Sequence, residues 1–74
     1  MIRILLKQLL DDKAFNERRR ITMQELSKET GISRPTITRL ANVPGYSTNT
    51  DTIAALCEYF DCEPGDILVR VRED

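Results

Sequence analysis

Apolar residues recur along this chain at intervals of three and four, which is the spacing of helices that bury one face. The pattern is clearest over residues 5–15 and over residues 49–60. The apolar stripe of the first segment consists of Leu6, Leu9, Leu10 and Ala14. The stripe of the second consists of Ile53, Leu56, Cys57 and Phe60. Asn49 is a natural N-cap for the second segment, so we expect an amphipathic helix in each.

Between these segments lie two helix-start signals separated by one glycine. Thr22 and Glu25 match a capping box, in which the Thr22 hydroxyl accepts from the Glu25 amide and the Glu25 carboxylate reaches back to the Thr22 amide. Ser33 is the second N-cap, and Pro35 fits the first turn, where an amide has no partner to lose. Gly31 lies where a left-handed residue closes a helix. The pattern predicts a helix, a glycine turn and a helix.

The two ends of the chain alternate apolar and polar residues, over residues 2–4 and 68–72. They can pair as a small antiparallel ribbon that joins the termini, or Ile2 and Ile4 can begin the first helix. Pro64 after Glu63 starts one further short turn of helix. We therefore expect an all-α fold of five short helices, with or without the ribbon. A chain of 74 residues supports one core, so residues 1–74 are expected to form a single domain.

The spacing also separates an inner from an outer face in the two glycine-linked helices. The apolar positions that can converge on one core are Leu26, Ile32, Ile37 and Leu40. The positions left outside are Arg34, Pro35, Thr38 and Arg39. The outer face of the second helix is therefore basic and rich in hydroxyl groups.

In these caps, glycine and apolar positions, residues 22–42 resemble the helix-turn-helix of the Cro/phage-repressor (XRE-type) family of bacterial and phage transcriptional regulators. Ser27 occupies the small position four residues before the glycine, and Ile37 and Leu40 occupy the apolar positions six and nine residues after it. The resemblance covers about the whole chain, although only this segment is specific. It implies a lambda-repressor-like domain whose second motif helix enters the major groove of double-stranded DNA.

The DNA-contacting residues that the resemblance and the exposed face imply are Thr22, Met23, Gln24, Ser33, Arg34, Pro35, Thr36, Thr38, Arg39 and Asn42. The family usually has a phosphate-contacting glutamine where Met23 stands. In this chain the phosphate contact can instead come from Gln24, from the N-terminal amides of the helix or from nearby arginines. Pro35 carries no donor, so base reading rests mainly on Arg34 and Arg39. The alternative for these two arginines is a surface ion pair, and for Thr36 and Thr38 a covering role.

Three consecutive arginines precede the motif, Arg18, Arg19 and Arg20, in a connection longer than the family usually has. They can neutralise phosphates near the start of the motif, or form a solvated loop or the last turn of the first helix. The formal net charge is −1, yet residues 1–15 carry +1, residues 16–42 carry +3 and residues 43–74 carry −5. The positive charge thus coincides with the motif, and we expect the acidic third to face away from DNA.

Other classes of function find little support. The chain has no histidine and no phosphate-binding glycine loop, so we predict no enzyme. Cys57 and Cys62 lie on apolar positions and are expected as buried reduced thiols, with no metal site and no cofactor. No small-molecule ligand is expected in so short a chain. The absence of a transmembrane run or signal peptide favours a soluble cytoplasmic protein.

The sequence therefore predicts a sequence-specific DNA-binding transcriptional regulator. We expect a homodimer on half-sites about 34 Å apart, with the apolar C-terminal strand edge as a candidate contact. The alternative is a protein-interaction module on the same fold, such as an antitoxin-like or adaptor subunit. Met23, Pro35 and the acidic overall balance favour that alternative.

Overall fold

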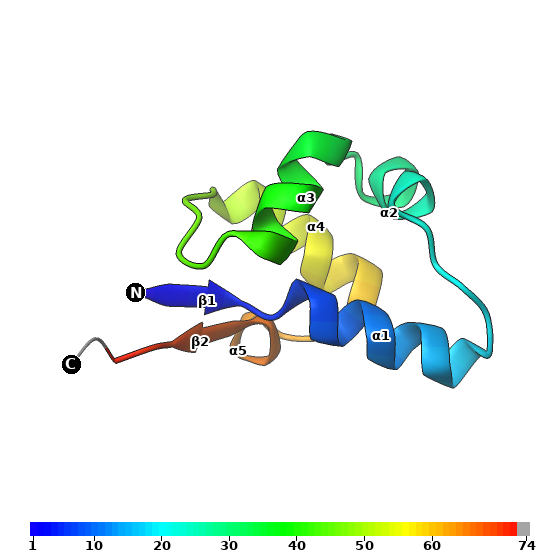
Figure 1. The fold of residues 1–74 in the computed structure, drawn as a ribbon, viewed down its shortest axis with the longest axis horizontal. Helices are drawn as coiled ribbons and strands as arrows, with labels where there is room; N and C mark the ends of the chain where they lie inside the picture. The colour runs from blue at the N-terminus through cyan, green and yellow to red at the C-terminus, as the bar shows by residue number, and fades with distance from the viewer. Residues whose placement is uncertain (73–74) are drawn as a thin grey trace.

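Five short helices and a two-stranded ribbon make up the computed structural model, which describes residues 1–72 (Figure 1). The elements follow in the order β1 (Ile2–Ile4), α1 (Leu6–Glu17), α2 (Met23–Thr30), α3 (Arg34–Asn42), α4 (Thr50–Phe60), α5 (Pro64–Ile67) and β2 (Leu68–Arg70). This confirms the predicted architecture, although α1 continues to Glu17 rather than ending near Phe15. Within residues 1–72, no helix has the length and apolar character needed to cross a membrane.

The ribbon joins the two ends of the chain, which lie together at one end of the molecule (Figure 1). β1 and β2 are antiparallel, with the facing pairs Ile2 and Arg70, Arg3 and Val69, and Ile4 and Leu68. The pairing continues by one step, because the Met1 carbonyl accepts from the Val71 amide at 2.8 Å. The alternative in which Ile2 and Ile4 begin α1 is therefore wrong. Backbone pairing between the ends satisfies the amides of β1 before the helix starts at Leu6.

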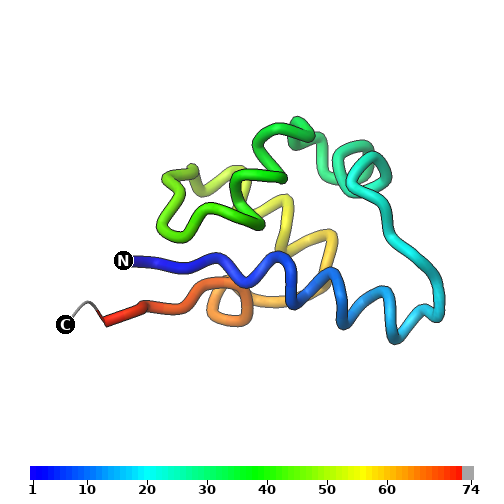
Figure 2. The backbone as a smooth tube through the Cα atoms, viewed as in Figure 1, coloured from blue at the N-terminus to red at the C-terminus, as the bar shows by residue number. Residues whose placement is uncertain are grey.

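Among residues 1–72, the core is formed by seven buried apolar side chains. Each of the five helices contributes at least one, and one comes from the turn between α2 and α3. They are Leu6, Leu26, Ile32, Ile37, Leu40, Leu56 and Ile67. The predicted convergence of the motif's apolar positions is thus confirmed. Figure 2 shows the path of α4, which runs from the α3 side of the molecule to the α5 side. Leu56 in the middle of α4 is fully buried because helices flank it on both sides.

The two cysteines depart from the sequence-based expectation. Cys57 and Cys62 are free thiols, but both are half-buried rather than buried. Each packs against the edge of the core, where α4 ends and the chain turns into α5. Burial nevertheless raises the pKa of the Cys62 thiol.

The helix starts are fixed by the side chains that the sequence indicated. The three predicted N-cap side chains each accept from the amide three residues on: Thr22 from Glu25 at 3.1 Å, Ser33 from Thr36 at 3.4 Å and Asn49 from Thr52 at 2.8 Å. One half of the predicted capping box is wrong. The Glu25 carboxylate accepts from the Arg19 guanidinium, at 2.7 Å, and so serves the preceding linker rather than the Thr22 amide.

Gly31 offers a test of the turn between α2 and α3. Its φ is +75°, and a Cβ added there would meet no atom within 4 Å, so Gly31→Ala introduces backbone strain alone. We expect this substitution to lower the free energy of unfolding by about 1–2 kcal/mol in urea denaturation. Gly65→Ala is the matched control, because that site is equally open without a positive φ. The control is expected to be neutral or stabilising by up to about 1 kcal/mol. Equal effects of the two substitutions would contradict the assignment of strain to Gly31.

Candidate nucleic-acid interface

The angle between α2 and α3 is held by hydrogen bonds across their turn. The Ser27 hydroxyl donates to the Ile32 carbonyl at 2.6 Å, and the Thr30 hydroxyl donates to the Leu26 carbonyl at 2.7 Å. Thr30 also accepts from the Ile32 amide at 3.2 Å. Ser27 is therefore more than a small residue near Gly31. Its hydroxyl satisfies the carbonyl of Ile32, which lies in the turn outside both helices.

The outer face of α3 is open to solvent. Its exposed residues are Arg34, Pro35, Thr38, Arg39 and Asn42, while Thr36 is half-buried. Among residues 1–72, no ion pair or side-chain hydrogen bond involves either arginine guanidinium. The surface ion pair considered as an alternative is thus not formed in this structure. Both guanidiniums are free to bind an outside acceptor.

The remaining polar groups of α3 are partly engaged within the helix. The Thr38 hydroxyl donates to the Arg34 carbonyl at 3.0 Å, and the Asn42 amide nitrogen donates to the Thr38 carbonyl at 3.0 Å. The Ser33 hydroxyl donates to the Thr36 hydroxyl at 2.8 Å. Oxygen acceptors and the Thr38 methyl group remain available on the outer face. Thr36 is the least accessible member of the set.

Met23 and Gln24, the two residues at the start of α2 considered for a phosphate contact, have different surroundings in the structure. Met23 is half-buried and packs against the core, whereas Gln24 is exposed. Thr22 is also exposed at the N-cap. A polar contact at this end is therefore available from Gln24 and from the first amides of α2, but not from Met23.

The three arginines before α2 have different surroundings. Arg19 is held by two carboxylates: its Nη1 lies 2.7 Å from Glu25 Oε1, and its Nε lies 3.0 Å from Glu17 Oε1. Arg18 is exposed and closes α1 with a φ of +54°, and Arg20 is exposed. Among the described residues neither Arg18 nor Arg20 takes part in an ion pair. α1 thus ends at this segment, as one interpretation predicted, and the role of Arg18 and Arg20 towards phosphate stays a prediction.

Arg19 belongs to a cluster of five polar side chains, the Arg19 cluster, which comprises Lys13, Glu17, Arg19, Glu25 and Tyr59. Lys13 Nζ lies 2.6 Å from Glu17 Oε2 and 5.0 Å from the centre of the Tyr59 ring. The Tyr59 hydroxyl lies 3.4 Å from Glu25 Oε2. Burial and the neighbouring Glu25 carboxylate raise the pKa of Tyr59. This cluster ties the linker to α1, α2 and α4. The Lys13–Glu17 pair has the i,i+4 spacing of a helix surface, but no local sequence pattern predicts the contacts with Glu25 and Tyr59.

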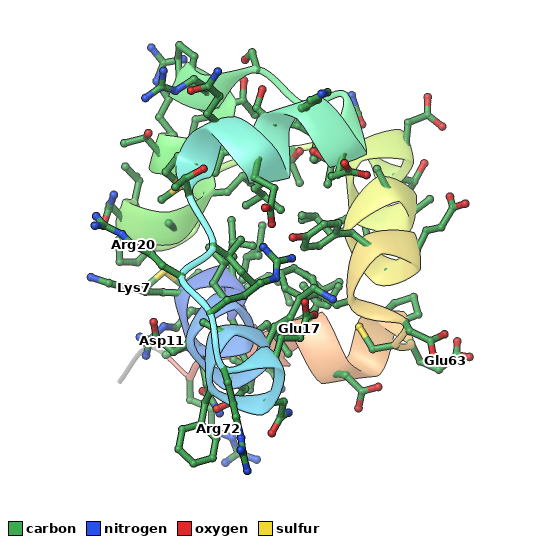
Figure 3. The ribbon with its side chains drawn as sticks, turned by 90° about the vertical axis from the view of Figure 1, so that its right-hand side faces the viewer. Lys7, Asp11, Glu17, Arg20, Glu63 and Arg72 are labelled. Carbon is green, nitrogen blue, oxygen red and sulfur yellow. The ribbon has the colours of Figure 1, made fainter. Side chains whose placement is uncertain are left out.

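The acidic part of the chain lies mainly away from α3. Exposed carboxylates gather at the end of α4 and around α5, namely Glu58, Asp61, Glu63 and Asp66. Figure 3 shows Glu63 on the side of the molecule opposite Arg20. Asp51 is an exception, because it lines a groove with Ser33 and Thr36 at the start of α3. The expected separation of charge therefore holds for the α5 end but not for the start of α4.

Sequence reasoning missed two cations near α3. Arg3 and Lys7 line a cleft together with Asn42 at the C-terminal end of α3. Their positions depend on how β1 and α1 pack beside α3, which the spacing of charges along the chain does not indicate. Within residues 1–72, no cluster of three or more potential metal ligands is present.

Two capped helices at a fixed angle, with an open basic outer helix, define a helix-turn-helix DNA-binding protein. Comparison with known proteins agrees: the family described as the Cro/C1-type HTH DNA-binding domain matches residues 6–73. The chain belongs to this family, and its fold and DNA-binding class are those predicted from the sequence. The family is one of DNA-binding domains rather than enzymes.

A curated relative from Bacillus subtilis (strain 168) bears the name uncharacterized HTH-type transcriptional regulator YozG. This chain is 34% identical to it over 58 residues, which cover 77% of this chain and 69% of the relative.

The Arg19 cluster predicts a pH dependence of stability. Hydrogen bonds from Arg19 hold the pKa of Glu25 below its usual value, and Lys13 and then Arg19 do the same for Glu17. A carboxylate whose pKa is lower in the folded state than in the unfolded state stabilises the fold at neutral pH. This stabilisation is lost as the pH falls below about 4.5 and the carboxylate becomes protonated. We therefore expect Arg19→Gln to be less stable than the wild type at pH 7, with the difference shrinking towards pH 3.

Chemical denaturation at several pH values measures this difference. Arg20→Gln is the matched control, and its profile should run parallel to that of the wild type. A constant gap between Arg19→Gln and the wild type across the acid range would show that the carboxylate pairing contributes nothing.

Proposed function

We propose that this protein is a sequence-specific transcriptional regulator that inserts α3 into the major groove of DNA and acts in the cytoplasm. The observation that carries the proposal is the outer face of α3, where Arg34 and Arg39 are exposed without an ion pair among residues 1–72. α3 contains no acidic residue that would repel phosphate. The family match and the name of the Bacillus relative support the regulatory role.

In this proposal the two arginines read separate base pairs. They are five residues apart, which corresponds to about 7.5 Å along a helix, roughly the spacing of two base-pair steps. Each guanidinium can donate two hydrogen bonds to guanine O6 and N7, a contact worth about 1–3 kcal/mol of discrimination. Pro35, Thr38 and Asn42 complete the face, with the Thr38 methyl group suited to a thymine methyl.

Contacts to the DNA backbone are proposed from the groups that surround this face. The exposed candidates are Thr22, Gln24, Ser33, Arg18 and Arg20. Arg19 is the weaker candidate, because a phosphate would have to displace the two carboxylates that bind it. Met23 and Thr36 are proposed to support the site by packing rather than by polar contacts.

We further propose that two copies bind a two-fold symmetric site, with half-sites about 34 Å apart. The outer edge of β2 is the proposed contact between them. Val69 on this strand is 41% exposed, and a short unpaired strand edge offers backbone groups to a second chain.

The salt dependence of binding tests the proposed function against a role as a protein-interaction module. Titration of a random-sequence duplex should give an affinity that falls steeply with salt, by about 0.9 in log K per unit of log salt for each phosphate neutralised. Fluorescence anisotropy at several salt concentrations measures this slope. No binding at low salt, or an affinity unaffected by salt, would reject the proposal and favour a protein partner.

The roles of the two arginines are tested by selecting preferred sites from a random duplex library. We expect Arg34→Ala and Arg39→Ala to relax the preference at different positions of each half-site, by about 1–3 kcal/mol. Arg18→Ala is the control, and should weaken all sequences alike while leaving the preferred sequence unchanged. If either α3 variant selects the wild-type sequence, that arginine does not read a base.

A further inference from the structure

A cleft with two cations lies beside the C-terminal end of α3. It has a volume of about 220 Å³ and is bordered by β1, the start of α1 and the end of α3 with its following loop. Arg3 and Lys7 line one side, and Asn42 with Val43 lines the other. Asn42 belongs to the exposed face of α3, so the cleft continues the proposed DNA-binding surface.

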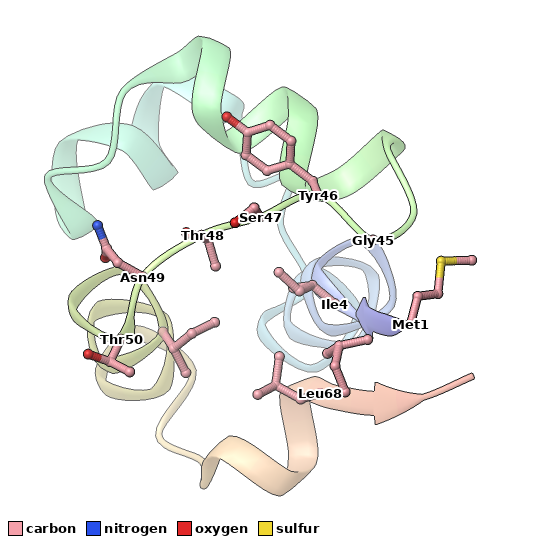
Figure 4. Close-up of a pocket in the computed structure, with 11 residues that line it drawn as sticks. Met1, Ile4, Gly45, Tyr46, Ser47, Thr48, Asn49, Thr50 and Leu68 are labelled. Atoms are coloured by element: carbon pink, nitrogen blue, oxygen red, sulfur yellow. The ribbon is translucent and has the colours of Figure 1, made fainter. Parts of the chain in front are cut away.

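Alternation along β1 directs Arg3 into this cleft. Ile2 lines an apolar pocket together with Leu68 of β2, whereas Arg3 lines the cleft (Figure 4). Successive side chains of a strand point to opposite faces, so Arg3 points away from the face that carries Ile2. Ile4, at the end of the strand, lines both the pocket and the cleft. Arg70 faces Ile2 in the register, so Arg3 is the arginine of the ribbon that lines the cleft beside α3.

The cations in the cleft are available for an outside anion. Arg3 and Lys7 are exposed, and neither takes part in an ion pair or a side-chain hydrogen bond among residues 1–72. Within the described residues 1–72 no carboxylate lines the cleft; Asp11, one helical turn beyond Lys7, is the acidic residue that follows it on α1. Figure 3 shows Lys7, Arg20 and Asp11 on the same side of the molecule.

The orientation of a recognition helix brings its C-terminal end towards the DNA backbone. Such a helix contacts base edges mainly with its N-terminal residues. In the proposed complex the C-terminal end of α3, about 13 Å from its start, therefore lies nearer to a bordering strand. The C-terminal end, which carries no base-reading arginine after Arg39, is the end next to Arg3 and Lys7.

We propose that Arg3 and Lys7 bind the sugar-phosphate backbone of the DNA that flanks the base-reading site, so that β1 and α1 extend the footprint of the helix-turn-helix. This inference rests on the proposed function, because it requires α3 to lie in the major groove. Each cation neutralises one phosphate, and their contribution is independent of the flanking sequence.

Duplex length separates this contribution from that of α3. The selected site is prepared as a minimal duplex and as a duplex with about six additional base pairs on each side, and binding is measured with the full chain. The variant Arg3→Gln/Lys7→Gln should bind the longer duplex about tenfold more weakly than the wild type at 50 mM salt, with a slope of log K against log salt shallower by about 1.8. On the minimal duplex the difference should largely disappear.

Lys28→Gln is the control, because it removes one positive charge from an exposed position of α2 that lies outside the cleft and is not among the proposed DNA contacts. It should behave as the wild type on both duplexes. A wild-type slope for the double variant, or an equal loss in Lys28→Gln, would overturn the inference. So would equal weakening on both duplexes together with a loss of stability in urea, since cations that only support the end of α3 give that result. If the wild type binds neither duplex, it is the proposed function that fails.

Discussion

The exposed face of α3 depends on two side chains that are hidden. Ile37 and Leu40 are buried in the shared core and fix the rotation of the helix about its axis. Once these two positions face inwards, the helical repeat leaves Pro35, Arg39 and Asn42 outside. Among residues 1–72 these two are the buried side chains of α3, and Ala41 packs beside them against the core. A change that let either side chain leave the core would therefore turn the arginines as well as weaken the fold.

Gly31 and Ser27 set the second constraint, which is the direction in which α3 leaves α2. Gly31 closes α2 in a left-handed conformation, and the Ser27 hydroxyl bonds the carbonyl of Ile32 beyond it. Both interactions act within six residues of the chain. The angle between α2 and α3 is thus determined by residues close together in the sequence. The position of these two helices on the rest of the protein is determined by the buried core.

This difference explains what could be predicted from the sequence. Caps such as Thr22, Ser33 and Asn49 involve residues three apart, so their pattern alone was sufficient to predict them. The pairing of Glu25 with Arg19 and Tyr59 could not be predicted, because Tyr59 is 34 residues away and meets Glu25 only when α4 packs on α2. The cleft of Arg3 and Lys7 was missed for the same reason, since it requires the register of the ribbon and the packing of α1 beside α3.

The separation of charge described above also affects how the protein meets DNA. Exposed carboxylates around α5 and arginines without an ion pair near α2 and α3 make the charge of a nearly neutral molecule uneven. In the field of a polyanion an uneven charge produces a torque as well as a net force. If α3 is the DNA-binding helix, as proposed, this torque turns α3 towards the DNA. The acidic end then acts on the rate of productive association more than on the strength of the final complex.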